Sequence, residues 1–235
     1  MKLTILIPTL PQRKLMLEQL MQSFTKQLGS QTQDPVVMRE AKYSCTTYFY
    51  QNVKVVTCMD RKQLTVGKKR NVLKTLVDTD YFTYIDDDDQ IADNYFEKVL
   101  AGIETGKDLI IFKAQMFSKG TLIHNVIYHP RFTKDFNVPA STKTDEKLKA
   151  AIKDKSKSWR TRIINSWPTT ANRIPNHLMV WRSELAKHTH FPDVNIGEDG
   201  AWAKTMKPRV STLHEIDEVL YYYLFDADTT ETQRR

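Results

Sequence analysis

The stretch YFTYIDDDDQIADNYF, residues 81–96, places four consecutive aspartates directly after an apolar run. Adjacent carboxylates repel one another, so the row costs free energy unless a cation or backbone amides neutralise it. The chain of 235 residues has a formal net charge of +7, which makes so acidic a row unusual for it. Residues 81–85 are typical of a buried strand. The row therefore predicts a cation site at the carboxyl end of a strand.

The spacing within the row predicts which carboxylates act together. If the chain stays extended beyond Ile85, Asp86 and Asp88 point to one side while Asp87 and Asp89 point to the other. Two carboxylates on one side form a hard-oxygen site that suits Mg²⁺ or Mn²⁺. The alternative is a solvated acidic turn that caps the following helix.

Strand-like and helix-like segments alternate on both sides of the row. The apolar patterns predict strands over residues 2–8, 53–58 and 81–85, and helices over 15–28, 67–77 and 93–103, the last with Asp93 as its N-cap. Such alternation predicts an α/β fold with a largely parallel sheet, in which ligands bind beyond the carboxyl ends of the strands. Residues 29–51 are polar and show no regular pattern.

The pattern changes after Asp108. Residues 108–115 and 121–128 flank a Ser-Lys-Gly turn and predict a hairpin, and a helix and a strand-like, tyrosine-rich segment follow near the end of the chain. We expect a single domain over residues 1–235. Its first half is 1–107 and its second half 108–235, with a basic insertion at about 130–165. We predict that the helix starts near Gly197 and that the tyrosine-rich strand covers residues 210–225.

Composition limits the class of protein. Hydrophobic residues make up 40% of the chain, which is enough for a sizeable core. No apolar run approaches the roughly 18 residues that span a bilayer. The apolar run near the N-terminus is short and contains Pro8, which argues against a signal peptide. With only Cys45 and Cys58, both expected as free thiols, we expect a cytoplasmic protein without integral membrane association.

A second motif, VGKKRN at residues 66–71, lies one element before the aspartates. A helix N-terminus that carries Gly67, Lys68 and Arg70 is suited to bind an anion, and arginine can hold phosphate oxygens in a bidentate fork. The alternative is a solvated basic helix start. A phosphate site and a divalent-metal site on consecutive elements together predict a nucleotide diphosphate held through its metal.

A third motif, NIGEDGAW at residues 195–202, contains the acidic pair Glu198 and Asp199. Acids at a helix start most often act as caps favoured by the helix dipole. If this pair faces the same crevice, a carboxylate that does not bind metal could accept a proton from an acceptor hydroxyl.

The order TILIPT, VGKKRN, YIDDDD, GEDGAWA and EVLYYY resembles the GT-A glycosyltransferases, in particular the family 2 inverting nucleotide-sugar transferases. The resemblance runs from Thr4 to about Tyr223, and the motifs are similar to a subgroup found in phages and large viruses. It implies a GT-A fold, in which a Rossmann-like, mostly parallel nucleotide-binding half is followed by a mixed acceptor-binding half. It also implies Mn²⁺ or Mg²⁺ and a UDP-sugar donor.

The resemblance assigns roles to individual residues. It places the nucleotide sugar on Pro8, Thr9, Asp60, Gly67, Lys68, Arg70, Asp86 and Asp87, although the sequence CMDRKQ around Asp60 departs from the family pattern. It places Asp86 near the ribose, Asp86 and Asp88 at the metal, and Asp199 as the general base beside Glu198. Many relatives carry a metal-binding histidine after the tyrosine-rich strand. Here Asp226, His214 or His177 would have to take its place.

The acceptor is the least defined part. Residues 143–162 contain eight Lys or Arg against three acids, which suits an anionic polymer such as DNA, although a solvated helix face is an equal alternative. The viral subgroup predicts a hydroxymethylated pyrimidine of phage DNA as acceptor, in the host cytoplasm, with glucose or a pentose such as arabinose as the sugar. We assign acceptor binding to Lys155, Lys157, Trp159, Arg160 and His177.

Two rival functions stay open. A transferase that builds lipopolysaccharide or capsule would act on glycan or lipid-linked acceptors. A metal-dependent nucleic-acid-binding protein or nuclease would hold two ions beside a phosphodiester and would need further acids at the site.

Overall fold

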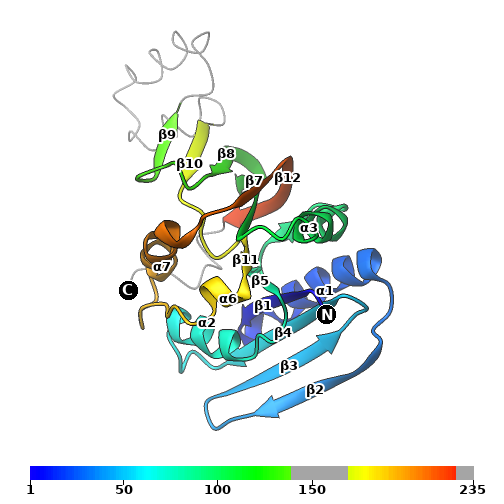
Figure 1. Cartoon of the computed structure of the whole chain (residues 1–235). Helices are drawn as coiled ribbons and strands as arrows, with labels where there is room; N and C mark the ends of the chain where they lie inside the picture. The colour runs from blue at the N-terminus through cyan, green and yellow to red at the C-terminus, as the bar shows by residue number, and fades with distance from the viewer. Residues whose placement is uncertain (139–168, 226–235) are drawn as a thin grey trace.

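The structure is a computed structural model that describes residues 1–138 and 169–225, and within these ranges one sheet of twelve strands runs through the molecule (Figure 1). The strand order is β2-β3-β4-β1-β5-β11-β7-β8-β10-β9, and β12 lies beside β7 and β6. The α/β fold predicted from the sequence is confirmed. The sheet is mixed, with parallel pairs at its centre.

The first half of the chain builds the parallel centre of the sheet. Its strands are β1 (Leu3–Thr9), β4 (Val53–Asp60), β5 (Tyr81–Tyr84) and the short β6 (Gln90–Ile91). Its helices are η1 (Pro11–Arg13), α1 (Lys14–Leu28), α2 (Val66–Thr75) and α3 (Tyr95–Ile103). Strand β1 pairs in parallel with β4 and β5, and every residue of it is buried. An apolar run buried on both faces is what a central parallel strand requires.

Residues 29–51 are more regular than the sequence suggested. They form a hairpin of β2 (Gln33–Arg39) and β3 (Tyr43–Phe49), which adds two antiparallel strands to the edge of the sheet beside β4. Strand β2 is almost entirely exposed and contains Pro35, so it has no alternating apolar face from which a strand could be predicted. The expectation of an irregular segment is therefore wrong. Both free cysteines are buried opposite each other, Cys45 on β3 and Cys58 on β4.

The second half of the chain continues the sheet. Its strands are β7 (Leu109–Ser118), β8 (Thr121–Tyr128), β9 (Phe136–Val138), β10 (Thr169–Arg173), β11 (Val180–Arg182) and β12 (Leu213–Phe225). Its helical elements are α6 (Ser183–Ala186), α7 (Glu198–Met206) and η3 (Lys207–Arg209). The predicted β7–β8 hairpin, the helix near Gly197 and the final strand are confirmed. The charged stretch 143–162 lies outside the described residues.

Strand β12 returns to the middle of the molecule. It pairs in parallel with β7 along most of its length and also pairs with β6, which directly follows the four aspartates. The last described strand therefore borders the acidic row.

Two helices meet their neighbours in ways that matter for the site. Helix α3 begins at Tyr95 with Asn94 at its N-cap, and Asp93 instead forms an ion pair with Lys26 at 2.9 Å, so the cap predicted for Asp93 is wrong. In α2 a Cβ on Gly67 would lie 1.8 Å from the carbonyl oxygen of Pro192, and its N–H donates to Val194. Gly67 thus lets α2 pack closely against the loop before α7.

No helix within the described ranges combines the length and apolar character needed to cross a bilayer.

Candidate active site

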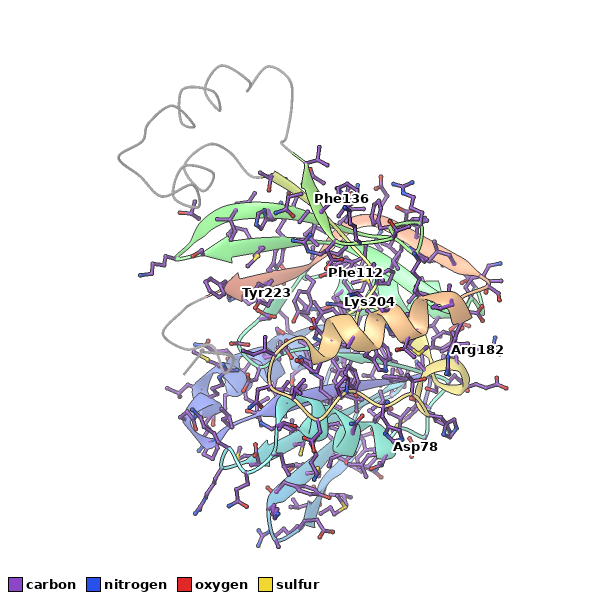
Figure 2. All side chains as sticks on the ribbon, turned by 90° about the vertical axis from the view of Figure 1, so that its left-hand side faces the viewer. Asp78, Phe112, Phe136, Arg182, Lys204 and Tyr223 are labelled. Atoms are coloured by element: carbon purple, nitrogen blue, oxygen red, sulfur yellow. The ribbon has the colours of Figure 1, made fainter. Side chains whose placement is uncertain are left out.

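A cleft of about 620 Å³ opens where the two halves of the chain meet. The first half contributes the carboxyl ends of β1 and β5 and the start of α2, and the second half contributes β7, β8, β10, β12 and α7. Figure 2 shows α7, labelled at Lys204, beside the strand end that carries Tyr223. The cleft lies beyond the carboxyl ends of the central parallel strands, as expected for an open α/β sheet.

The four aspartates form a turn, not a continued strand. Strand β5 ends at Tyr84, and the N–H of Asp89 donates to the carbonyl of Asp86 at 3.2 Å. Asp86, Asp87 and Asp88 line the cleft, whereas Asp89 points into the protein. Asp86 and Asp88 therefore face the same cleft, but the predicted alternation is wrong, because the turn brings Asp87 to that side as well.

Arg13, which the sequence analysis missed, neutralises two of the carboxylates. Its Nη1 lies 2.7 Å from Oδ1 of Asp87, and its Nη2 lies 3.0 Å from Oδ2 of Asp88. The hydroxyl of Thr9 donates to the other oxygen of Asp87 at 2.6 Å, so this fully buried carboxylate is held from two sides. A basic residue just after the PT at the end of β1 was the only signal in the sequence.

The fourth aspartate has a structural partner in β12. The hydroxyl of Tyr221 donates to Oδ2 of Asp89 at 2.5 Å, and the N–H of Leu224 donates to Oδ1 at 2.8 Å. The same hydroxyl accepts the N–H of Asp86 at 3.3 Å. Burial and the charges of Asp86 and Asp88 raise the pKa of Asp89 well above its usual value. Asp89 therefore ties the turn to β12 and does not face the cleft.

Arg70 connects the aspartate turn to α7. Its guanidinium lies 3.2 Å from Asp86 and 3.5 Å from Glu198, and it packs over the ring of Tyr84. Burial acts to lower the pKa of Arg70, but the two carboxylates outweigh it and raise this pKa. Burial raises the pKa of Glu198 to about 7 despite the nearby arginine. Arg70 thus brings a positive charge into the cleft between two acids from different elements.

Asp199 is the most accessible acid at this junction. Its side chain is 36% exposed, and its Oδ1 accepts the N–H of Gly200 at 2.7 Å. Asn176 and His177 lie 3.5 Å and 3.8 Å from its Oδ2. His177 is buried between Asp199 and Asp86, and its Nε2 lies 3.6 Å from Asp86. Burial and Arg70 lower the pKa of His177, which favours the neutral imidazole. Asp199 therefore faces the cleft as a carboxylate with no cationic partner among the described residues.

The sequence profile of glycosyl transferase family 2 matches residues 29–181, more than half of the chain. The chain belongs to glycosyl transferase family 2. The matched region contains both VGKKRN and the aspartate row, but it ends before Glu198 and Asp199. A comparison with curated proteins gave no match.

Solved structures agree on the fold. The structure of S. aureus TarS residues 1–349 superposes with a TM-score of 0.58 at 18% identity, covering 95% of this chain and 60% of TarS 1–349. The same TarS fragment in complex with UDP-GlcNAc gives 0.58 at 16% identity, with 96% and 59% coverage, and its UDP complex gives 0.58 at 17%, with 97% and 62%. The chain thus spans about 60% of the length of these relatives. The likeness establishes a GT-A type fold.

Several residues that the family 2 resemblance assigned to the nucleotide sugar lie elsewhere. Asp60 is buried in an ion pair with Lys69 at 2.6 Å and also accepts two backbone N–H groups. Gly67 is packed against the loop at 192–194, and Lys68 is exposed on α2 away from the cleft. Pro8, Arg70, Asp86 and Asp87 do line the cleft, while Thr9 lies behind Asp87. Of the basic motif at residues 66–71, Val66 and Arg70 line this cleft.

The residues predicted as extra metal ligands or acceptor contacts differ in whether they line the cleft. His214 lies on β12 against Gly102 of α3 and does not line the cleft, so it cannot join Asp88. His177 does line it. The remaining assigned residues lie outside the described ranges: Asp226, Lys155, Lys157, Trp159 and Arg160.

The cleft residues of this family 2 protein fit a divalent cation whose shell is completed by phosphates and water. Within the described ranges, no group of three or more His, Cys, Asp or Glu side chains converges in the manner of a complete protein cage. Asp86 and Asp88 nevertheless face the cleft, and burial together with Asp86 raises the pKa of Asp88 to about 6. A cation would relieve this repulsion, and Mg²⁺ commonly takes one or two carboxylates and completes its shell with phosphates and water.

Proposed function

We propose that the protein is a metal-dependent inverting glycosyltransferase that uses a UDP-sugar donor. The observation that carries the proposal is that Arg70, Asp88 and Asp199, from three separate elements, line one cleft. Family membership supports glycosyl transfer, and TarS binds UDP-GlcNAc in the same fold. We infer a hexose or pentose donor such as UDP-glucose or UDP-arabinose.

The residues of the cleft divide the chemistry between them. Asp86 and Asp88 would hold the Mg²⁺ or Mn²⁺, which when bound supplies positive charge to the departing diphosphate. Arg70 lies beside Asp86 and stabilises the same negative charge as it develops, which is the main way such a site accelerates transfer. Its ion pairs with Asp86 and Glu198 fix the guanidinium before the donor arrives.

Asp199 is proposed as the general base. A carboxylate without a cationic partner, open to the cleft, can accept the proton of an attacking hydroxyl. The new bond from that oxygen to the anomeric carbon forms as the bond to the diphosphate oxygen breaks. Attack from the side opposite the leaving group inverts the configuration. His177 and Asn176 orient the base through contacts on one of its oxygens, Oδ2.

For the acceptor we propose a hydroxymethylated pyrimidine of double-stranded DNA, as in the phage and large-virus subgroup, modified in the host cytoplasm. The net charge of +7 and the basic sequence at 143–162 support an anionic polymer. A lipopolysaccharide or capsule acceptor is the competing enzymatic proposal. The nuclease alternative needs further acids beside the aspartates, and the described residues offer no such cluster.

The test is release of UDP from a panel of UDP-sugars with Mn²⁺ or Mg²⁺, with and without DNA that contains hydroxymethylcytosine. Asp88→Asn is expected to abolish the metal-dependent release. Asp93→Asn is the matched control, because Asp93 lies in the same stretch of sequence but on the surface, paired with Lys26. Release that needs metal but not DNA would redirect the search to glycan acceptors. No engagement of any nucleotide sugar would refute the proposal.

A further inference from the structure

Three cationic side chains line the end of the cleft that the second half of the chain forms. Arg173 comes from β10, Lys134 from the segment between β8 and β9, and Lys204 from α7. None of the three forms an ion pair with an acid among residues 1–138 and 169–225. Asp135 lines the same end, but its carboxylate accepts the N–H of Ile174 at 3.0 Å. This end of the cleft therefore carries an excess of positive charge.

Arg173 is held in place while most of its donors stay available. It is half-buried, and its strand pairs with β8 so that Arg173 lies opposite Tyr128. Its Nη1 donates to the carbonyl of Asn172 at 3.1 Å and reaches that of Phe136 at 3.5 Å. The Nε and Nη2 groups have no partner among the described residues. A positioned guanidinium with free N–H groups is suited to grip a phosphate in two places.

The floor beside these cations is apolar. Between Arg173 and the aspartate turn, the cleft is lined by Ala114, Met116, Val126, Tyr128, Ala171, Ile174 and Tyr223. Tyr128 lies directly opposite Arg173 in the β8–β10 pair, which places Arg173 at the edge of this floor. An apolar floor with cations at one edge fits a flat ring that carries a phosphate.

The spacing along α7 sets the scale of such a ligand. Lys204 follows Asp199 by five residues, which corresponds to about 7.5 Å along the helix axis. Asp199, Lys204 and Arg173 line the same cleft, so a ligand with a hydroxyl at Asp199 can extend to the two cations.

We propose that this end of the cleft is a phosphate subsite for the acceptor, in which Arg173 is the main ligand and Lys134 and Lys204 add charge, and that the phosphate is a backbone phosphodiester of DNA. The inference rests on the proposed function for the identity of the acceptor. The cations themselves are independent of it. Arg173 thus becomes a residue that determines acceptor specificity.

The experiment measures binding of a short fluorescein-labelled DNA duplex to the full chain by anisotropy, across a salt series. Each phosphate contact contributes about −0.9 to the slope of log K against log salt. Arg173→Gln and Lys204→Gln are each expected to reduce that slope by about 1 and to weaken binding by about tenfold at moderate salt. Lys119→Gln is the matched control, because Lys119 is exposed on the β7–β8 turn and does not line the cleft.

UDP binding to the same proteins, followed by calorimetry, separates this inference from the proposed function. Normal UDP binding with weakened DNA binding in Arg173→Gln supports both. DNA binding that depends on Arg173 without any UDP binding would support the phosphate subsite and refute the transferase. A slope unchanged by Arg173→Gln would overturn the subsite. Loss of binding to phosphatidylglycerol vesicles but not to DNA would refute the DNA source in favour of a lipid phosphate.

Discussion

The two ends of the cleft differ in whether their cationic side chains are paired with acids. At the end built by residues 1–107, Arg13 and Arg70 are each paired with carboxylates in the free protein. At the end built by β8, β10 and α7, Arg173 and Lys204 have no acidic partner among the described residues. The first end is therefore organised before any ligand arrives, which suits the proposed binding of a charged donor there. The cations of the second end stay available to pair with a ligand.

Asp199 stands at the junction of the two ends, and its loss should have the largest effect. Asp199→Asn keeps the shape and the contact with Asn176 but removes the proton acceptor. We expect the rate of transfer to fall by roughly 10²- to 10⁴-fold, with UDP binding unchanged. Single-turnover transfer and UDP calorimetry measure the two quantities. A variant that retains more than a tenth of the rate would show that the base is another group.

Replacing one arginine at each end tests the comparison directly. Arg70→Gln removes the cation that pairs with the buried Glu198 and the partly buried Asp86, and we expect the free energy of unfolding to fall by about 3 to 5 kcal/mol. Arg173→Gln removes no ion pair with a described residue, so the change should stay within about 0.5 kcal/mol. Urea unfolding of both variants provides the values. Equal losses would contradict the claim that only one end is organised by ion pairs.

The pH dependence of stability tests the burial of Glu198. Its pKa is about 7 in the folded protein and 4.5 in an ordinary setting, so the folded state holds the proton more tightly. Stability should therefore fall as pH rises from about 4.5 to 7, by up to about 3 kcal/mol from this group. Glu198→Gln should remove that part of the decline. Unfolding of both proteins at pH 5 and pH 8 makes the comparison, and parallel declines would mean that Glu198 is not the source.

The parts of the fold that could be predicted are those where burial leaves a pattern. The run at β1 and the periodic faces of α1 and α3 were visible because each buries apolar residues in a regular order. The β2–β3 hairpin could not be predicted, because β2 is exposed and is a strand through its pairing with β3. Edge strands of this kind carry little information in their own sequence.

The site shows the same division. The sequence could single out Arg70, Asp88 and Asp199, because each belongs to a local motif whose residue types suggest a chemical role. It could not single out Arg13 and Tyr221, because each acquires its role from a partner more than 70 residues away in the chain. The ligand-binding roles predicted for Gly67 and Asp60 stay predictions, because the structure shows both residues in packing contacts. Their residue types suit ligand binding. Gly67, however, packs α2 against residues 192–194, and Asp60 forms an ion pair with Lys69.

The hydrogen bond from Tyr221 to Asp89 has a consequence for how the protein is made. The two residues are 132 positions apart, so at about 5 to 20 residues per second a ribosome needs about 7 to 26 s to reach the tyrosine after the aspartate. Until then the carboxyl group of Asp89 lacks both of the donors that the described residues give it. Arg13 and Thr9 can hold Asp87 before β12 is made, but the carboxyl group of Asp89 gains its two donors only when the final strand docks. A truncation that removes β12 should therefore leave the carboxyl group of Asp89 without these two donors and weaken the binding of a nucleotide at the aspartate turn.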